Sequence, residues 1–389
     1  LGLSRTHRTY VEGPAIAAAW KHEREDLVRY AIDDALDVNT VSELALPTEF
    51  YQAQILPRSL QSVATGGPGE KINDLLIRAY VAAGRSLPSP SQPKDYPGGY
   101  AELRRTGRFS PVVKCDVESL YPSIMLADNI GPGTDDLGVF IPMLRELTTR
   151  RLHAKREEQR AEGRDRALWR GIQSSLKVLI NSFYGYLGYS RALFNDYDAA
   201  TRVTLRGQDI IQRIVSQLEA SGATTIEIDT DGVFFQPPPD IASFEAEFAL
   251  IDDVNATLDP GIRLAHDGRF RAMLSLKLKN YALLTHEGRT VLKGSSLRSR
   301  REEPFLRQFL REAISQLLLD PTAFSQVRDT YLLAGKRILD NDLNPDEIGR
   351  METITQAIRD GRNGPPGAEG LRGERVGERL AVYQRADGT

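Results

Sequence analysis

The pattern of hydrophobic and polar positions predicts a chain of long helices interrupted by short strands. Apolar residues recur at helical spacing in residues 22–45, which we expect to form an acidic amphipathic helix that ends at Leu46 and Pro47. A turn at 161–166 should join two further helices into a helical hairpin. The full set of additional helices is expected at 49–85 with a break at Gly66, Gly67 and Gly69, at 139–160, at about 167–187, at 199–221 and from 304 to about 358.

Shorter apolar segments separated by turn residues predict strands. Residues 111–115 should form a strand that ends at Asp116, and residues 224–236 alternate as a hairpin around a turn at 230–232. Further strands are expected within 274–285, 289–297 and 380–383. Helices and strands in this order favour an α+β protein with an antiparallel sheet and helical attachments.

Composition narrows the class of protein. The chain has 389 residues, of which 41% are hydrophobic and 26% are charged, as in soluble proteins of two or three domains. It contains no apolar run long enough for a bilayer and no signal-peptide core. Cys115 is the single cysteine, which excludes an internal disulfide and a zinc site built from several cysteines. We expect a cytoplasmic protein, and the start at Leu1 indicates a fragment or a processed product.

Charge is segregated along the chain although the net charge is only −3. Basic residues are concentrated in 145–170 and 269–301, whereas 23–37 is acidic. Segregation of this kind is found in basic clefts that bind nucleic acid. Charge alone favours the simpler interpretation, in which these stretches are solvated helix faces.

Three aspartates occupy positions from which a sheet can present carboxylates. Asp116 ends a strand, and Asp229 and Asp231 flank the turn of the hairpin. Carboxylates that share a site repel each other unless cations compensate them, and Mg²⁺ is suited to oxygen ligands of this kind. Two such ions can activate an attacking hydroxyl and stabilise a leaving oxygen. The alternative is that Asp-Thr-Asp-Gly is simply a turn sequence.

Two predicted helix faces carry groups that can bind phosphate. Lys177, Asn181 and Tyr184 are spaced as i, i+4 and i+7, and Arg151 and Lys155 as i and i+4. Cations directed to a common side can bind a triphosphate, although ordinary surface charge explains the same spacing.

The motifs together resemble those of family B DNA polymerases, in the order in which that family has them. The resemblance covers roughly residues 22–340. It is carried by DVESLYPS at 116–123, KVLINSFYGYLGY at 177–189 and DTDG at 229–232, with YPGGY at 96–100, KNY at 279–281 and LKGSSLRSRR at 292–301. Departures are Gly232 where many members have Ser, Asn280 where Arg is common, and a short thumb with a Gly-rich end.

The resemblance implies a role for each matching residue. Asp116, Asp229 and Asp231 would be catalytic, with two Mg²⁺ ions, or Mn²⁺ as a substitute, held by Asp116, Asp231 and the carbonyl of Val117. Tyr121 would exclude a ribose 2′-hydroxyl, and Tyr184 would lie near the new base pair. The full nucleotide site would be Ser119, Leu120, Tyr121, Arg151, Lys155, Lys177, Asn181 and Tyr184, and the DNA contacts would be Lys279, Tyr281, Lys293, Arg298 and Arg300.

The resemblance also implies a right-hand architecture and a truncated proofreading domain. Tyr30 and Asp34 resemble the third exonuclease motif, although a helix with a coincidental Tyr and Asp is the alternative. The implied parts are an exonuclease remnant at 1–45, connecting helices and linker at 46–100, palm at 101–135 and 191–292, fingers at 136–190 and thumb at 293–389.

We therefore expect a monomeric, template-directed DNA polymerase that acts on primer-template DNA and dNTPs, with a processivity clamp as a candidate partner. Two other hypotheses are a non-catalytic polymerase-fold protein that binds primer-template DNA, and a nuclease based on Tyr30 and Asp34. The Arg- and Ala-rich composition suggests a bacterial or phage-like source.

Overall fold

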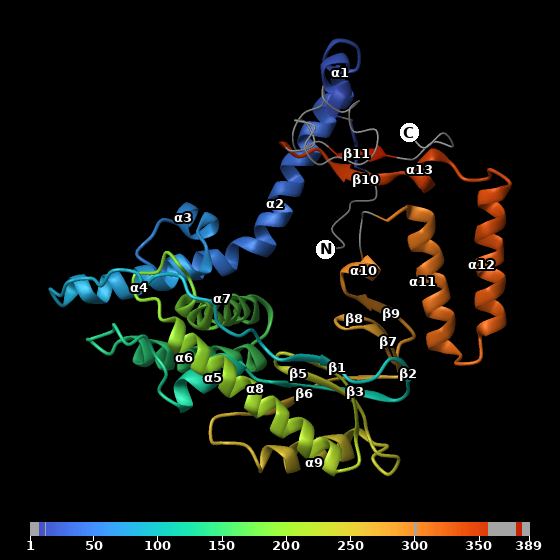
Figure 1. Ribbon diagram of the computed structural model, residues 1–389. Helices are drawn as coiled ribbons and strands as arrows, with labels where there is room; N and C mark the ends of the chain where they lie inside the picture. The colour runs from blue at the N-terminus through green and yellow to red at the C-terminus, as the bar shows by residue number, and fades with distance from the viewer. Residues whose placement is uncertain (1–7, 12, 299–301, 357–378, 383–389) are drawn as a thin grey trace. The chain divides into compact units, whose positions relative to one another are not determined.

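The computed structural model describes residues 8–11, 13–298, 302–356 and 379–382 (Figure 1). The chain forms two compact units, each built from two stretches of sequence. Unit 1 comprises Leu1–Pro97 and Ser119–Arg206, and unit 2 comprises Gly98–Glu118 and Gly207–Thr389. Within the described residues, no helix is both long enough and apolar enough to cross a membrane.

Unit 1 is helical and is organised around α7 (Gly163–Leu187), which packs against α6 (Phe140–Arg160) as the predicted helical hairpin (Figure 1). The break predicted at the glycines is confirmed, because α3 ends before Gly66 and α4 begins at Pro68. The other helices of unit 1 are the 3₁₀ turn η1 (Gly13–Ala15), α1 (Ile16–His22), α2 (Arg24–Ile55), α3 (Leu60–Thr65), α4 (Pro68–Ala82), α5 (Leu120–Ala127) and the first part of α8 (Tyr197–Ala220).

The helix α2 runs through Pro47, so the predicted end at Leu46 and Pro47 is wrong. A proline inside a helix removes one backbone hydrogen bond, and packing must compensate for the loss. Here Gly171 of α7 lets the two helices approach closely, since a Cβ at that position would lie 2.6 Å from the Tyr51 ring and 3.5 Å from Pro47 Cβ. Ser175 Oγ also donates to the Thr48 carbonyl at 2.6 Å.

The described residues of unit 2 contain two larger antiparallel sheets and a separate strand pair, which confirms a mixed helix and antiparallel-sheet fold. The five-stranded sheet has the order β1-β4-β5-β3-β6, and the four-stranded sheet has the order β2-β7-β8-β9. The strands are β1 (Ala101–Leu103), β2 (Gly107–Phe109), β3 (Val112–Val117), β4 (Thr224–Asp229), β5 (Gly232–Gln236), β6 (Leu264–Phe270), β7 (Ala272–Lys277), β8 (Asn280–Leu284) and β9 (Thr290–Lys293). A separate pair is formed by β10 (Arg350–Thr353) and β11 (Arg379–Val382).

The helices of unit 2 attach to these sheets. They are α9 (Phe244–Asn255), α10 (Ser295–Arg298), α11 (Pro304–Leu319), α12 (Phe324–Leu339) and α13 (Pro345–Ile348), with the rest of α8. The helix predicted to continue to about residue 358 instead gives way to β10. The single strand predicted within 274–285 is two strands, β7 and β8, joined at Lys279, whose φ of 60° permits the tight turn. In the segment 289–297, β9 ends at Lys293 and α10 begins at Ser295.

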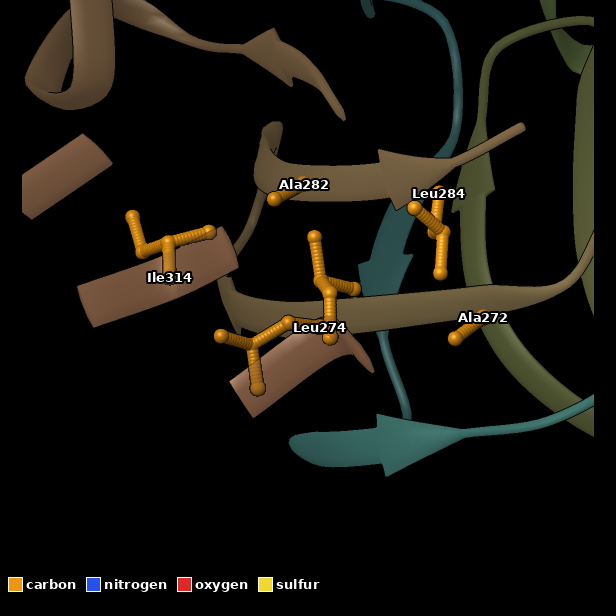
Figure 2. Close-up of a cluster of buried hydrophobic side chains, with 6 residues drawn as sticks. Ala272, Leu274, Ala282, Leu284 and Ile314 are labelled. Atoms are coloured by element: carbon orange, nitrogen blue, oxygen red, sulfur yellow. The ribbon is translucent and has the colours of Figure 1, made fainter. Parts of the chain in front are cut away.

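A buried apolar cluster fixes the four-stranded sheet to α11 (Figure 2). The strands contribute Ala272, Leu274, Ala282 and Leu284, and α11 contributes Ile314 and Leu318. A second cluster joins the two sheets through Val112, Ile226, Phe234, Met273 and Leu283. Val112, the first residue of β3, therefore lies in a packed core, and this core supports the strand that leads to Asp116.

We expect Leu284→Ala to lower the free energy of unfolding of unit 2 by about 2–5 kcal/mol, because the substitution leaves a cavity in a closed cluster. Leu284 is 1% exposed, whereas Leu276 of β7 is 44% exposed. Leu276→Ala is the matched control and should change stability by no more than about 0.5 kcal/mol. Urea unfolding measures both, and equal losses would contradict the assignment of the core.

Candidate active site

The strands β3 and β5 bring two of the predicted aspartates together at one end of the sheet. Asp116 is directly opposite Gly232 in the register, and Asp231 immediately precedes Gly232. The backbone N–H of Val117 donates to the carbonyl of Asp231 at 2.8 Å. The sequence did not indicate that these strands are neighbours, so this pairing is a structural finding.

The turn that carries Asp231 is held in an unusual backbone conformation. Thr230 has a φ of 60°, a left-handed value that is unfavourable for a β-branched residue. The N–H of Asp231 donates back to the Asp229 carbonyl at 2.7 Å, which closes a three-residue turn. The N–H of Thr230 donates to the Tyr100 carbonyl at 2.8 Å. The YPGGY segment thus supplies a fixed backbone acceptor for the turn.

The carboxylates are coupled electrostatically. Burial raises the pKa of Asp231, and the negative charges of Asp116 and Asp229 raise it further, against the opposing effect of Lys114. Acids that disfavour each other's ionised form attract cations to the space between them.

Two lysines balance part of this charge. Lys114 Nζ lies 3.2 Å from Asp116 Oδ2 and 2.5 Å from Asp267 Oδ2. Burial opposes the charge of Lys114, but its hydrogen bond with Asp267 and the field of Asp116 outweigh burial and raise its pKa. Lys279 Nζ lies 2.9 Å from Asp229 Oδ1. A role for Lys114 or Asp267 was not predicted from the sequence. The signal for Lys114 was its position two residues before Asp116, because side chains two residues apart on a strand point to the same face.

Glu227 is a further residue that sequence reasoning missed. Its side chain is buried, and it accepts a hydrogen bond from the N–H of Lys279 at 2.7 Å. Burial raises the pKa of Glu227, and its Oε2 atom has no hydrogen-bond partner within the described residues. Tyr281 packs edge-on against Phe234 with ring centroids 4.9 Å apart. The structure therefore fixes both residues of the predicted Lys-x-Tyr motif to the five-stranded sheet.

The donor set suits a hard divalent cation. Asp116 on β3 and Asp231 in the turn before β5 offer carboxylate oxygens, and Mg²⁺ commonly binds one or two carboxylates and takes its remaining ligands from water and substrate. In the part of the chain that the structure describes, no group of three or more His, Cys, Asp or Glu side chains is arranged to hold a metal ion. Two carboxylates, from β3 and from the turn before β5, fit an open site that water and substrate complete.

Unit 1 contains the predicted nucleotide-binding residues. Arg151 donates from Nη1 to Ser119 Oγ at 3.3 Å, so α6 and the start of α5 meet. Tyr121 of α5 stacks on Tyr184 of α7 with centroids 4.0 Å apart, and the Tyr184 hydroxyl lies 2.7 Å from Thr204 Oγ1. The remaining predicted residues include Leu120, which is buried, and Lys155, Lys177 and Asn181, which are exposed.

The predicted exonuclease and DNA-contact residues lie on several separate elements. A hydrogen bond from Tyr30 to Asp34 raises the pKa of the tyrosine, and Asp34 is ion-paired with Arg8. Lys293 is exposed at the end of β9, and Arg298 belongs to α10. Arg300 lies outside the described residues.

The single cysteine provides a chemical probe of β3. Cys115 is fully buried, and burial raises the pKa of its thiol to about 12. Because the thiolate is the reactive form, we expect iodoacetamide to leave Cys115 unmodified in the native protein and to label it completely in urea. Mass spectrometry measures the labelling, and rapid modification without denaturant would contradict the burial of this strand.

Comparisons with known proteins agree with the geometry. Residues 134–358 match the model of the family described as DNA polymerase family B. A DNA polymerase of Archaeoglobus fulgidus is 28% identical over 89% of this chain and 47% of its own length. DNA polymerase 1 of Pyrococcus abyssi is 27% identical over 72% of this chain and 41% of its own length. The chain thus spans less than half the length of these relatives.

A solved structure supports the fold independently. The family B DNA polymerase of the archaeon Pyrobaculum calidifontis matches 100% of this chain and 55% of its own chain, with a TM-score of 0.73 and 20% sequence identity.

The archaeal origin of these relatives corrects one prediction. A bacterial or phage-like source was inferred from Arg- and Ala-rich composition, and composition was not sufficient evidence for it. The matched residues, together with the register that places Asp116 beside the turn of Asp231, show that this chain belongs to DNA polymerase family B.

Proposed function

We propose that this chain is the catalytic core of a DNA-directed DNA polymerase that adds dNTPs to a primer 3′-hydroxyl. The observation that carries the proposal is the pair Asp116 and Asp231: Asp116 lies on β3, Asp231 directly precedes the neighbouring strand β5, and their carboxyl groups are coupled electrostatically. The family relationship indicates which reaction such a pair would serve.

Asp116 and Asp231, with the carbonyl of Val117, would hold two Mg²⁺ ions. Ions bound there would promote ionisation of the primer hydroxyl and stabilise the leaving pyrophosphate. Asp229 would contribute charge beside them, and its ion pair with Lys279 would keep it oriented. The strained turn at Thr230 would fix the direction of Asp231 before substrate binds.

Unit 1 would bind the incoming nucleotide. Cations and polar groups on α6 and α7 would contact the triphosphate, while Ser119 and Leu120 would offer backbone N–H groups at the start of α5. The ring of Tyr121 would lie under the sugar, supported from one side by Tyr184. The full contact set we propose for the phosphates is Arg151, Lys155, Lys177 and Asn181.

The regions of the chain would correspond to the parts of a right-hand polymerase. We assign the α6–α7 hairpin within 136–190 to the fingers, 101–135 and 191–292 to the palm, and 293–389 to the thumb. Residues 1–45 would be the end of an exonuclease domain, with Tyr30 and Asp34 as its remaining motif, and 46–100 the connection. The primer-template would run along Lys279, Tyr281, Lys293, Arg298 and Arg300, whose cations would contact phosphates without reading sequence.

Primer extension tests the proposal. The wild-type chain should extend a labelled primer when given dNTPs and Mg²⁺, and EDTA should stop extension without abolishing binding of the duplex. Binding is measured in parallel by fluorescence anisotropy. Duplex binding without any extension would favour a non-catalytic DNA-binding protein, and absence of both would sink the proposal for this chain. We also propose that the chain acts as a monomer, with a processivity clamp as a candidate partner.

A further inference from the structure

A lysine shares a strand face with Asp116. Lys114 precedes Asp116 by two residues, and the two-residue period of a strand directs both side chains to the same side. The lysine contacts Asp116 and Asp267 together, and its side chain is 24% exposed. Its ammonium also lies 5.8 Å from the centre of the Phe234 ring. Lys114 is therefore a fixed positive charge within the acidic site and not a solvated surface group.

A β-bulge directs the second acid toward this lysine. Between β3 and β6 the register shifts, so that Lys114 is opposite Gly268 while Cys115 is opposite His266. Asp267 is the extra residue between those two partners. Bulges of this kind redirect a side chain beside functional sites. The acid that anchors Lys114 is thus positioned by the backbone of the sheet.

A glycine leaves the space that the lysine uses. Gly232 is opposite Asp116 on β5, and a Cβ built there would lie 3.2 Å from Asp116 Oδ2 and 3.4 Å from Lys114 Cε. A Cβ at this position would be in tight contact with the Asp116 carboxylate and in van der Waals contact with the Lys114 side chain. The family motif often has serine here, so Gly232 leaves space beside Asp116 and Lys114 that a larger residue would occupy.

We infer that Lys114 is a positioning residue for Asp116 and that Gly232 provides the room in which it acts. The inference rests on the proposed function, because it concerns how the site admits its cation. The ammonium holds the Asp116 carboxylate in one orientation and competes with a divalent cation for it. The site consequently binds a cation weakly by itself and more strongly when the phosphates of a nucleotide supply further oxygen ligands.

Binding of Mn²⁺ alone, measured by electron paramagnetic resonance with the full chain, tests the inference without requiring activity. Lys114→Met keeps the length of the stem and removes the charge, so the Mn²⁺ affinity should rise by about threefold or more. Lys114→Arg should stay within about twofold of wild type, because it restores a cation. Lys336→Met, at an exposed lysine of α12, is the matched control and should change nothing. Asp116→Asn should remove the Mn²⁺ site and so identify it.

Gly232→Ala tests the second half of the inference. In the wild-type background it should change the Mn²⁺ affinity, because the new methyl group would lie 3.2 Å from Asp116 Oδ2 and so shift the carboxylate that Lys114 contacts. In the Lys114→Met background the same substitution should have a much smaller effect, and this non-additivity is the sign of direct coupling. Additive effects would overturn the role of Gly232. Unchanged or weaker Mn²⁺ binding by a folded Lys114→Met variant would overturn the role of Lys114.

The result can be separated from a failure of the proposed function. A wild-type chain that binds Mn²⁺ through Asp116 but does not extend primers would refute the polymerase proposal and leave the Lys114 measurements valid. A wild-type chain that extends primers, with Lys114→Met identical to it in Mn²⁺ binding, would refute only the inference about Lys114.

Discussion

Asp231→Asn is expected to reduce primer extension on the order of 10³-fold while leaving the protein folded. The substitution keeps the shape of the side chain and removes a metal-binding charge. Burial and the charge of Asp116 raise the pKa of Asp231, which shows that the ionised form is unfavourable in this environment. The asparagine should therefore maintain or increase the free energy of unfolding, since repulsion with Asp116 is removed.

Single-turnover primer extension and urea unfolding on the same preparation check this prediction. The matched control is Asp253→Asn, which makes the same chemical change at an exposed position of α9. That variant should extend primers at the wild-type rate. Extension by Asp231→Asn at a comparable rate would show that this carboxylate does not hold a catalytic ion, and loss of folding would show that it is structural.

Tyr121→Ala is expected to increase incorporation of rNTPs relative to dNTPs by roughly 10- to 100-fold. The tyrosine ring lies against Tyr184 in a stacked arrangement, so it is held in place before any nucleotide binds. A rigid ring beneath the sugar would collide with a 2′-hydroxyl, whereas alanine leaves room for it. The effect should appear mainly in the ratio of kcat/KM for the two sugars and less in the rate with dNTPs.

Tyr121→Phe is the control for this second prediction. It retains the ring and the stack and removes only the phenolic hydroxyl, so sugar discrimination should remain close to wild type. Steady-state incorporation of a single nucleotide from matched dNTP and rNTP measures both variants. An alanine variant with unchanged discrimination would refute the assignment of Tyr121, and a phenylalanine variant as permissive as alanine would assign the effect to the hydroxyl.

The sequence predicted those parts of the fold that depend on local pattern. The helical hairpin of α6 and α7, the strand that carries Asp116, which ends one residue later than predicted at Val117, and the hairpin around Asp231 each follow from hydrophobic period and turn residues. The motif resemblance supplied the order of the candidate residues. What pattern could not supply was the neighbours of β3, because β3 pairs with β5 and β6 from distant parts of the chain.

Tertiary packing explains the remaining differences. Pro47 stays inside α2 because the close approach to Gly171 compensates for the lost hydrogen bond, and that contact joins residues more than 100 positions apart. Strand β6 was missed because its sequence, LAHDGRF, lacks regular alternation and contains the bulge at Asp267. The role of Lys114 follows from that bulge and from Gly232, so it required the register of two strand pairs.

The position of β3 inside the five-stranded sheet has a consequence for synthesis of the protein. Both strands that flank β3 are made after it, and residue 270 follows residue 116 by 154 positions (270 − 116). At usual rates of translation this interval lasts roughly 8–30 s, and until it ends the strand lacks at least one of its two partners. Val112, Val113, Cys115 and Val117 are the buried apolar residues of this strand. The charges of Lys114 and Asp116 interrupt that apolar run, and charged interruptions of this kind lower the tendency of an unpaired strand to aggregate.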